Sequence, residues 1–176
     1  LDKVLSHGAY IMGPEVEELE AKLSTYVGVS HCISCASGTD ALLMALMAHG
    51  IGPGDAVFTS PFTFMATAEV IGLLGAVPVF VDVDPETYNI CPAALSATLS
   101  TMASSSRPSA GTPEGLRPRA IVPVDLYGLP ADYARLGEIA VENDLVLIED
   151  AAQSFGATQN RIRAGALAPV AATSFF

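Results

Sequence analysis

The sequence has 176 residues, 51% of them hydrophobic, which is enough for one sizeable core. Its formal net charge is −11, from 8 basic and 19 acidic residues, so no basic stripe is available to bind nucleic acid. The longest apolar run, residues 70–81, is interrupted by Gly and Pro and is too short to cross a bilayer. We therefore expect neither a nucleic-acid partner nor a membrane segment.

Both ends of the sequence look cut. Residues 1–5 do not begin with Met and read like the middle of a helix, whereas residues 173–176 form an apolar, strand-like run without a turn. We expect the chain to be a piece of a larger protein.

The first well-defined element is an amphipathic helix. Pro14 follows a turn-rich stretch and suits the first position of a helix, and Gly28 ends it. Glu18 and Lys22 have the spacing of a surface ion pair. The apolar side chains that share one helical face are Val16, Leu19, Leu23 and Tyr26.

The next stretch has the features of an anion site. A β-prone run, residues 29–35, leads through a small turn into a helix over 41–48 that is apolar nearly all round and predicted to be buried. This order places the amides of Gly38 and Thr39 at a helix N-terminus, where free N–H groups and the helix dipole suit a phosphate or carboxylate. The local alternative is that Ser37 only caps the helix.

The three cysteines predict no metal site. Cys32 and Cys35 form a C-x-x-C pair, but on a strand this spacing points the two thiols to opposite faces, and Cys91 is isolated. We interpret all three as buried free thiols in a reducing cytoplasm.

Beyond residue 50, predicted strands alternate with predicted helices. Residues 77–82 form a continuous apolar run, as expected of a strand covered on both faces. Residues 100–119 are rich in Ser, Pro and Gly and are predicted to form a flexible surface excursion. The order predicts an α/β fold with a mainly parallel sheet. The strands are expected at 56–58, 77–82, 120–124 and 145–148, and the helices at 65–74, 92–99 and 132–143.

Four polar clusters follow the strands or open the helices of this predicted sheet. Ligands bind parallel sheets at the carboxyl ends of the strands, so we expect these clusters to form one site. They are residues 37–39, 63–64, 125–127 and 150–153.

These clusters suit a phosphorylated aromatic cofactor. The phosphate would lie on Gly38 and Thr39, and Phe64 would lie flat against a ring. Asp150 would keep a ring nitrogen protonated, which makes the ring a stronger electron sink, and Gln153 would bind a ring substituent. Taken singly, Phe64 also fits a core side chain and Asp150 a turn cap, but the whole set favours a ligand site.

Five motifs, in order and at familiar spacing, resemble the DegT/DnrJ/EryC1/StrS family of pyridoxal-phosphate-dependent sugar aminotransferases, which have the aspartate aminotransferase fold (fold type I). The resemblance covers nearly the whole chain outside 100–119. It implies that residues 1–176 are the cofactor-binding large domain, a three-layer α/β structure incomplete at both ends, without the C-terminal small domain. The motifs are Ser37–Leu42, Thr63–Thr67, Pro123–Gly128, Glu149–Gln153 and Ser174–Phe175.

The resemblance also implies site roles. Asp150 pairs with the ring nitrogen, and Gln153 pairs with the ring hydroxyl. Tyr10 and Tyr127 are candidate substrate-side residues, whereas Asp125 stands where the family often has His and receives no firm role. The remaining cofactor-binding residues are Gly38, Thr39 and Ser174 at the phosphate and Phe64 on the ring.

The family's catalytic lysine, which forms a Schiff base with the cofactor, is expected a few residues beyond Phe176. The chain has only Lys3, near its first residue, and Lys22, on a helix surface. Asp150 is therefore the one catalytic residue assigned within the chain, and this piece alone is not expected to turn over.

The resemblance predicts that the parent protein transfers an amino group, from glutamate, to a keto sugar nucleotide. The runs 123–128 and 173–176 look most like members that act on UDP-linked 3-keto N-acetylated hexuronates. A cytoplasmic homodimer is expected, because the family usually forms one. Two alternatives remain: a sugar dehydratase of the same family, with His in place of the lysine, and a non-catalytic regulatory or sugar-binding relative.

Overall fold

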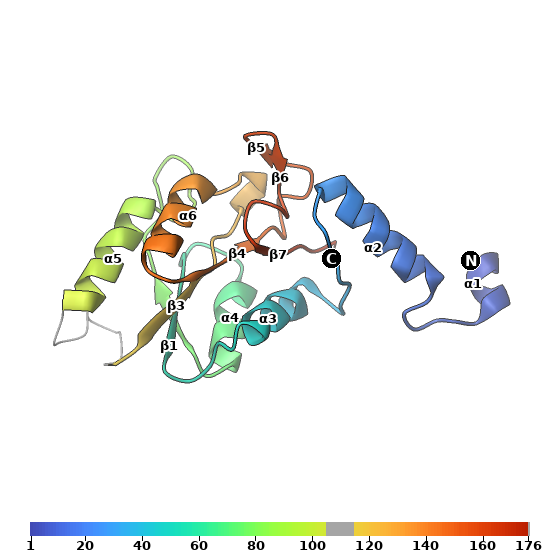
Figure 1. The fold of residues 1–176 in the computed structure, drawn as a ribbon, viewed down its shortest axis with the longest axis horizontal. Coiled ribbons are helices and arrows are strands. Elements are labelled where there is room, and N and C mark those ends of the chain that lie inside the picture. The colour runs from blue at the N-terminus through green and yellow to red at the C-terminus, as the bar shows by residue number, and fades with distance from the viewer. Residues whose placement is uncertain (105–114, 176) are drawn as a thin grey trace.

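The computed structural model describes residues 1–104 and 115–175, and a five-stranded sheet lies at its centre (Figure 1). The strand order is β2-β1-β3-β4-β7, and every neighbouring pair is parallel. The carboxyl ends of the five strands therefore share one edge, as the sequence predicted. The strands are β1 (Asp55–Thr59), β2 (Val77–Phe80), β3 (Arg117–Ile121), β4 (Val146–Asp150) and β7 (Val170–Ala172).

Helices cover both faces of this sheet (Figure 1). One group of buried apolar side chains joins the sheet to α3 (Gly38–Ala48) and α4 (Met65–Leu73), and it contains Val57 of β1. A second group joins the sheet to α5 (Pro92–Ser104) and α6 (Tyr133–Glu142), and it contains the next residue, Phe58. Successive strand residues point to opposite faces, so one strand supplies both cores. The predicted three-layer α/β architecture is confirmed.

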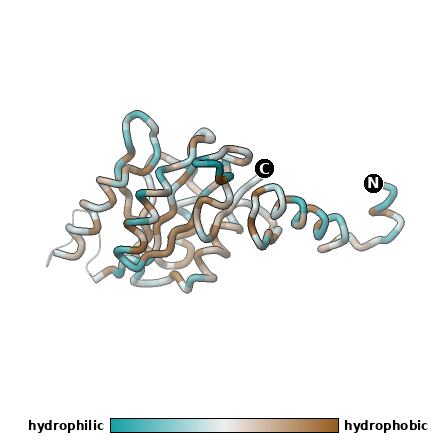
Figure 2. The backbone as a smooth tube through the Cα atoms, turned by 45° about the horizontal axis from the view of Figure 1, so that its top comes forward, coloured by the Kyte–Doolittle hydropathy of each residue, from teal (hydrophilic) through white to brown (hydrophobic). Residues whose placement is uncertain are grey.

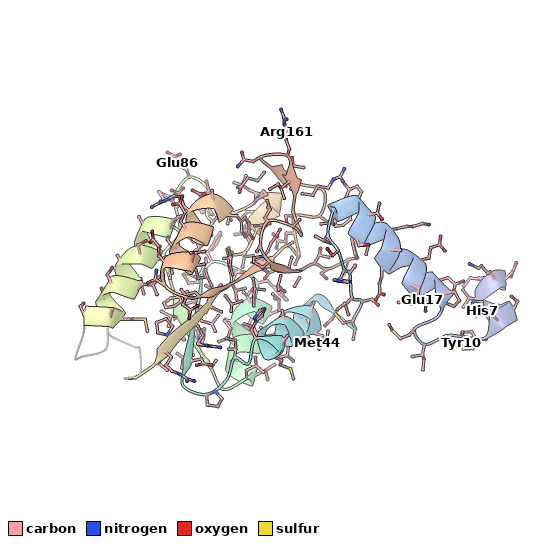
Figure 3. All side chains as sticks on the ribbon, viewed as in Figure 1. His7, Tyr10, Glu17, Met44, Glu86 and Arg161 are labelled. Carbon is pink, nitrogen blue, oxygen red and sulfur yellow. The ribbon has the colours of Figure 1, made fainter. Side chains whose placement is uncertain are left out.

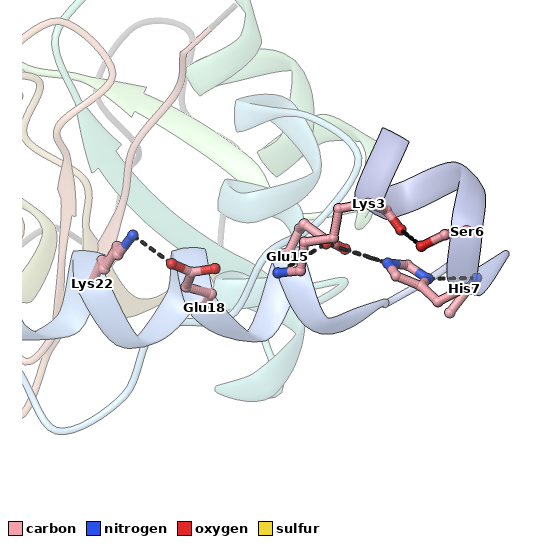
Figure 4. Close-up of polar contacts among 7 residues, drawn as sticks. Lys3, Ser6, His7, Glu15, Glu18 and Lys22 are labelled. Atoms are coloured by element: carbon pink, nitrogen blue, oxygen red, sulfur yellow. Dashed lines mark hydrogen bonds and ion pairs between the residues drawn. The ribbon is translucent and has the colours of Figure 1, made fainter. Parts of the chain in front are cut away.

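The N-terminal helices extend away from this body. Neither α1 (Asp2–His7) nor α2 (Pro14–Val27) has a buried residue, and Figure 2 shows the apolar segments concentrated in the body around the sheet. Polar contacts hold this region, including Lys3–Glu15 at 3.4 Å and Lys22–Glu18 at 2.6 Å (Figure 4). These pairs are solvent-exposed and contribute little stability.

The predicted limits of α2 are correct. Pro14 occupies its first turn, and Gly28 ends it with φ 89°, a left-handed conformation that suits glycine. The expected surface pair of Glu18 and Lys22 is also present.

The strand predicted at 29–35 is wrong. Side chains from 31 to 35 alternate between exposed and half-buried, but this segment joins no strand of the described sheet. Instead, the Ser34 amide and hydroxyl both donate to Glu20 at 2.7 Å. The argument that Cys32 and Cys35 lie on opposite strand faces therefore has no basis. Cys32, Cys35 and Cys91 are free thiols, as predicted, but none of them is buried: Cys35 is exposed, and Cys32 and Cys91 are half-buried.

Two further predictions need correction because local hydrophobicity overestimates burial. Helix α3 buries Leu42 and Leu46, but Met44 and Met47 are 44% and 56% exposed. Strand β2 lies at the sheet edge and leaves Phe80 exposed, so it is not covered on both faces.

The irregular surface segment predicted at 100–119 is shorter at both ends than the sequence indicated. Helix α5 continues to Ser104, and β3 begins at Arg117, three residues before its predicted start. The middle of that prediction, 105–114, lies outside the described residues.

Short elements between β4 and β7 were not predicted. Strands β5 (Thr158–Gln159) and β6 (Ile162–Arg163) pair antiparallel across Asn160 and Arg161, which both have positive φ. Such a two-residue hairpin carries too little pattern to detect in the sequence. The remaining element is a 3-10 turn, η1 (Leu126–Gly128), after β3.

No helix in the part of the chain that the structure describes combines the length and apolarity needed to cross a membrane.

Candidate functional site: a pocket at the carboxyl edge of the sheet

A pocket opens where β4 and β7 end and where α3 and α4 begin. Its empty space is about 620 Å³, counting the part open to solvent. The predicted cofactor-binding residues, which come from four segments of the chain, all line this pocket. They are Gly38, Thr39, Phe64, Asp150, Gln153 and Ser174.

The N-terminus of α3 forms one end of the pocket. Ser37 is extended, and its hydroxyl oxygen accepts a hydrogen bond from the Asp40 amide at 3.1 Å. The capping interpretation of Ser37 is therefore correct. It does not compete with the anion site, because the amides of Gly38 and Thr39 have no acceptor within the helix itself.

Gly38 lies in close contact with Ser174. A Cβ atom placed on Gly38 would lie 2.8 Å from the Ser174 Cβ and 3.1 Å from its hydroxyl oxygen. Only glycine allows this approach without displacing the chain after β7. The contact places a hydroxyl-bearing residue beside two helix-end amides, a donor set suited to phosphate.

Phe64 lines the pocket as an exposed ring. Its side chain is 71% exposed, and it directly precedes α4 as its N-cap residue. The alternative that Phe64 belongs to the core is therefore wrong. An exposed aromatic ring in a pocket provides a flat apolar surface for a planar ligand.

Asp150, at the end of β4, is a buried carboxylate that faces the pocket. It is 4% exposed, and its Oδ2 accepts a hydrogen bond from the Thr67 hydroxyl at 2.8 Å. Burial raises the pKa of Asp150, and the bond from Thr67 opposes this rise. No ion pair links it to a cation among residues 1–104 and 115–175. A protonated ring nitrogen would supply the missing positive charge.

Asp150 also accepts a hydrogen bond from the Ala152 amide at 3.3 Å. The turn-cap interpretation of this residue is thus compatible with the ligand interpretation.

The orientation of Gln153 follows from its backbone partner. The Tyr127 amide donates to Gln153 Oε1 at 2.7 Å. The Nε2 group is therefore the end of the amide that can donate to a ligand. Such a donor suits a ring oxygen that carries negative charge.

Thr67 is a site residue that sequence reasoning did not single out. It lies one turn into α4, three residues after Phe64, and its hydroxyl joins Asp150 to Thr63, whose hydroxyl is 3.3 Å away. A hydroxyl residue on the apolar, buried face of α4, which it shares with Ala66, Val70 and Ile71, was the available signal.

Thr67→Val is expected to weaken both the domain and its ligand site. The change removes a buried hydrogen bond to a carboxylate and should lower the free energy of unfolding by about 1–3 kcal/mol. It should also raise the pKa of Asp150 further and so weaken the binding of a protonated ring. Urea unfolding and cofactor titration measure the two effects. Thr63→Val is the matched control, because Thr63 does not contact Asp150, and equal losses in both variants would contradict this role of Thr67.

The two candidate substrate-side tyrosines do not line the pocket. Tyr10 lies between α1 and α2, beyond the body of the domain (Figure 3), and is 66% exposed. Tyr127 is 76% exposed and has φ 56°, and only its amide connects it to the pocket through Gln153. Asp125, which received no role, is fully buried behind the pocket.

The described residues contain no group of three or more His, Cys, Asp and Glu side chains placed to hold a metal ion. The donors of the pocket are amides and hydroxyls, which suit an anionic organic ligand.

The fold and the pocket fit one class of protein, the α/β domains that hold a phosphorylated, nitrogen-containing ring at the carboxyl edge of a parallel sheet. Within that class, the model of the DegT/DnrJ/EryC1/StrS aminotransferase family matches residues 1–176. The chain belongs to this family, as its motifs predicted.

Individual relatives agree with this assignment. Over 176 residues, the chain is 51% identical to the UDP-2-acetamido-2-deoxy-3-oxo-D-glucuronate aminotransferase of Pseudomonas aeruginosa, covering all of this chain and 45% of that protein. The crystal structure of a DegT DnrJ EryC1 StrS aminotransferase from Brucella abortus is 52% identical, with a TM-score of 0.91 over 99% of this chain and 45% of that one.

A third relative bears on the cofactor. The structure of NtdA from Bacillus subtilis contains the bound cofactor PMP, the amino form of pyridoxal phosphate. It is 33% identical, with a TM-score of 0.80 over 97% of this chain and 35% of that one. The predicted cofactor is thus confirmed for the family. The chain spans less than half the length of these three relatives.

Proposed function

We propose that the full-length protein is a pyridoxal-phosphate-dependent aminotransferase that acts on a nucleotide sugar. The observation that carries the proposal is Asp150, a buried carboxylate with no cationic partner among the described residues, in the same pocket as the helix-end amides of α3. A pocket with a negative group at one end and amide donors at the other is complementary to a ring with a protonated nitrogen and a phosphate.

Each pocket residue has a part in this proposal. The amides of Gly38 and Thr39, with the Thr39 hydroxyl and Ser174, hold the phosphate. Phe64 stacks on the ring, and Gln153 Nε2 donates to the ring hydroxyl oxygen. When bound, pyridoxal phosphate supplies an electron sink for the electron pair left when the amino donor loses its α-proton.

Asp150 supports that chemistry by holding a proton on the ring nitrogen. Its carboxylate stays next to the developing charge and is fixed by Thr67, so it need not reorganise during the reaction. Lys3 and Lys22 pair with Glu15 and Glu18 on the N-terminal helices, and neither lines the pocket, so neither is placed to move the proton on the donor's α-carbon.

The substrate proposal rests on the relatives. The Pseudomonas protein is named for a UDP-linked 3-oxo sugar acid, and we propose the same substrate class here, with glutamate as amino donor. We also propose a cytoplasmic homodimer, with residues 1–176 as the cofactor-binding domain. Tyr10 and Tyr127 stay candidates for substrate contact, although neither lines the pocket of the single chain.

A spectroscopic experiment tests the function. Full-length protein supplied with pyridoxal phosphate should show the visible absorption of a protein-bound cofactor. Glutamate should convert this spectrum to that of the amino form, and a UDP-linked 3-keto N-acetylated hexuronate should restore it. Cofactor absorption that glutamate does not change would contradict amino transfer. Failure to bind the cofactor would favour the regulatory alternative.

A further inference from the structure

Two segments of the chain run side by side where they leave β4 and β7. The Ala151 amide donates to the Ala172 carbonyl at 2.8 Å, and the Thr173 hydroxyl donates to the Ala151 carbonyl at 3.2 Å. These bonds continue the parallel pairing of the two strands, whose last paired residues are Asp150 and Ala172. They fix the two segments to each other at the edge of the sheet.

A second contact joins the same two segments farther along the chain. The rings of Phe155 and Phe175 meet edge to face, with centroids 4.9 Å apart and planes at 76°, a favourable geometry for an aromatic pair. In sequence, Gln153 and Ser174 lie between this contact and the bonds at Ala151. Gln153 and Ser174 both line the pocket, so the spacing of the two segments determines the spacing of these two pocket residues.

The last turn of α2 supports this aromatic contact. The Tyr26 ring stacks on Phe155, with centroids 5.2 Å apart and planes at 25°. The Arg163 guanidinium carbon lies 4.2 Å from the centroid of the Tyr26 ring, within the range of a cation–π contact, and the same guanidinium donates to the Tyr26 carbonyl. The end of α2 therefore lies beside the β5–β6 hairpin (Figure 1) and is connected to both pocket segments through Phe155.

The rings of Tyr26, Phe155 and Phe175 form an aromatic cluster outside the buried core. They are 42%, 40% and 53% exposed, respectively, and they belong to neither group of buried side chains that joins the sheet to its helices. Replacing one of these rings therefore removes little buried area. It does release the two pocket segments from each other or from α2.

We propose that this aromatic cluster positions the cofactor-binding residues, with Phe155 at its centre, because it sets the spacing at which Gln153 and Ser174 reach one cofactor molecule. The proposal rests on the proposed function, in which Gln153 binds the ring hydroxyl oxygen and Ser174 the phosphate. It also gives α2 a part in the site, although α2 buries no residue. Its last turn restrains the segments that carry both contacts.

Phe155→Leu in the full-length protein without cofactor tests the proposal with two ligands, pyridoxamine phosphate and pyridoxamine. Leucine keeps an apolar side chain but removes both ring contacts. The dissociation constant of pyridoxamine phosphate should rise by about 2- to 10-fold, the effect of losing an aromatic pair. Pyridoxamine has no phosphate and needs no fixed spacing, so its dissociation constant should stay at the wild-type value. Titration calorimetry measures both constants.

The comparison of the two ligands separates positioning from damage to the fold. Damage to the fold weakens both ligands by the same factor, so an equal loss for both would overturn the positioning role, as would unchanged binding of both. Phe80→Leu is the matched control. Phe80 is 53% exposed at the sheet edge and has no ring contact within residues 1–104 and 115–175, so neither constant should change.

Tyr26→Leu tests the part played by α2 and keeps the proposal falsifiable if Phe155→Leu does not fold. Because α2 buries no residue, the urea midpoint of Tyr26→Leu should stay close to that of the wild type. The dissociation constant of pyridoxamine phosphate should rise by about 2- to 10-fold, and Tyr26→Phe, which keeps a ring, should restore wild-type affinity. Wild-type affinity in Tyr26→Leu would overturn the role of α2.

Leu19→Ala is the control within the same helix. Leu19 is 47% exposed, similar to Tyr26, and its replacement should leave the affinity for pyridoxamine phosphate unchanged. An equal loss in Leu19→Ala and Tyr26→Leu would contradict a role of the ring itself. A wild type that binds no pyridoxamine phosphate would contradict the proposed function together with this role, whereas normal wild-type binding that Phe155→Leu leaves unchanged would contradict this role alone.

Discussion

Asp150→Asn in the full-length protein is expected to slow amino transfer by about 10²- to 10³-fold, with the fold retained. Asn offers no negative charge, so it does not hold a proton on the ring nitrogen and the ring accepts electrons less readily. Asn still has an oxygen that accepts from Thr67 in place of the carboxylate, whose bond is 2.8 Å long. The rate to measure is that of the half-reaction with glutamate, and Asp150→Ala should lose at least as much.

Asp55→Asn provides the matched control. Asp55 is also a buried carboxylate in the sheet, 2% exposed, but it lies at the amino end of β1, where it binds Arg117 at 2.8 Å. Its neutralisation should lower the unfolding temperature and leave the half-reaction unchanged. Asp150→Asn should show the opposite pattern. A normal half-reaction rate in Asp150→Asn would show that this carboxylate is not the partner of the ring nitrogen.

The positions of the motifs in the sequence predict the pocket well because the strands of the central sheet are all parallel. Once strands end at one edge, residues that follow them are brought together whatever their separation in sequence. Asp150 ends β4 and Phe64 lies between β1 and α4, so both reach this edge for that reason. Gly38 follows no strand, and it reaches the same pocket because α3 packs on the sheet.

Contacts across the fold are harder to predict. Thr67 reaches Asp150 only because α4, which packs against β1 and β2, has one rotational setting about its axis, and no local sequence pattern predicts that setting. The same holds for Asp125, whose partners Tyr133 and Ser154 lie on two separate segments. A carboxylate in the middle of an apolar run signals that partners exist without identifying them.

Errors in the predicted fold have a different origin. Residues 29–35 have strand-like alternation, but a strand also requires a neighbour to pair with, and the described sheet provides none. Met44 and Phe80 are apolar and yet exposed. Hydrophobicity records a preference for burial, whereas the position of an element at an edge or a rim decides whether burial occurs.

Gly38→Ala is expected to raise the dissociation constant of the cofactor by about 10- to 100-fold, the effect of about 1–3 kcal/mol of overpacking. The new methyl group would lie 2.8 Å from the Ser174 Cβ and 3.6 Å from the Thr173 carbonyl oxygen. Either α3 or the segment after β7 must move, and both carry phosphate donors. Stability should change much less, because alanine favours the helix by about 1 kcal/mol over glycine.

Two comparisons establish that this loss comes from the contact with Ser174. Gly137→Ala in α6 adds a methyl group with no neighbour within 4 Å, so it should stabilise the fold without changing cofactor affinity. In a Ser174→Gly background, the clashing Cβ is absent. Adding Gly38→Ala there should cost less than threefold, although Ser174→Gly itself weakens binding by removing a hydroxyl donor. Contacting residues give such non-additive effects, whereas independent sites add. A full 10- to 100-fold cost of Gly38→Ala in that background would mean that the glycine is needed for the ligand's own approach.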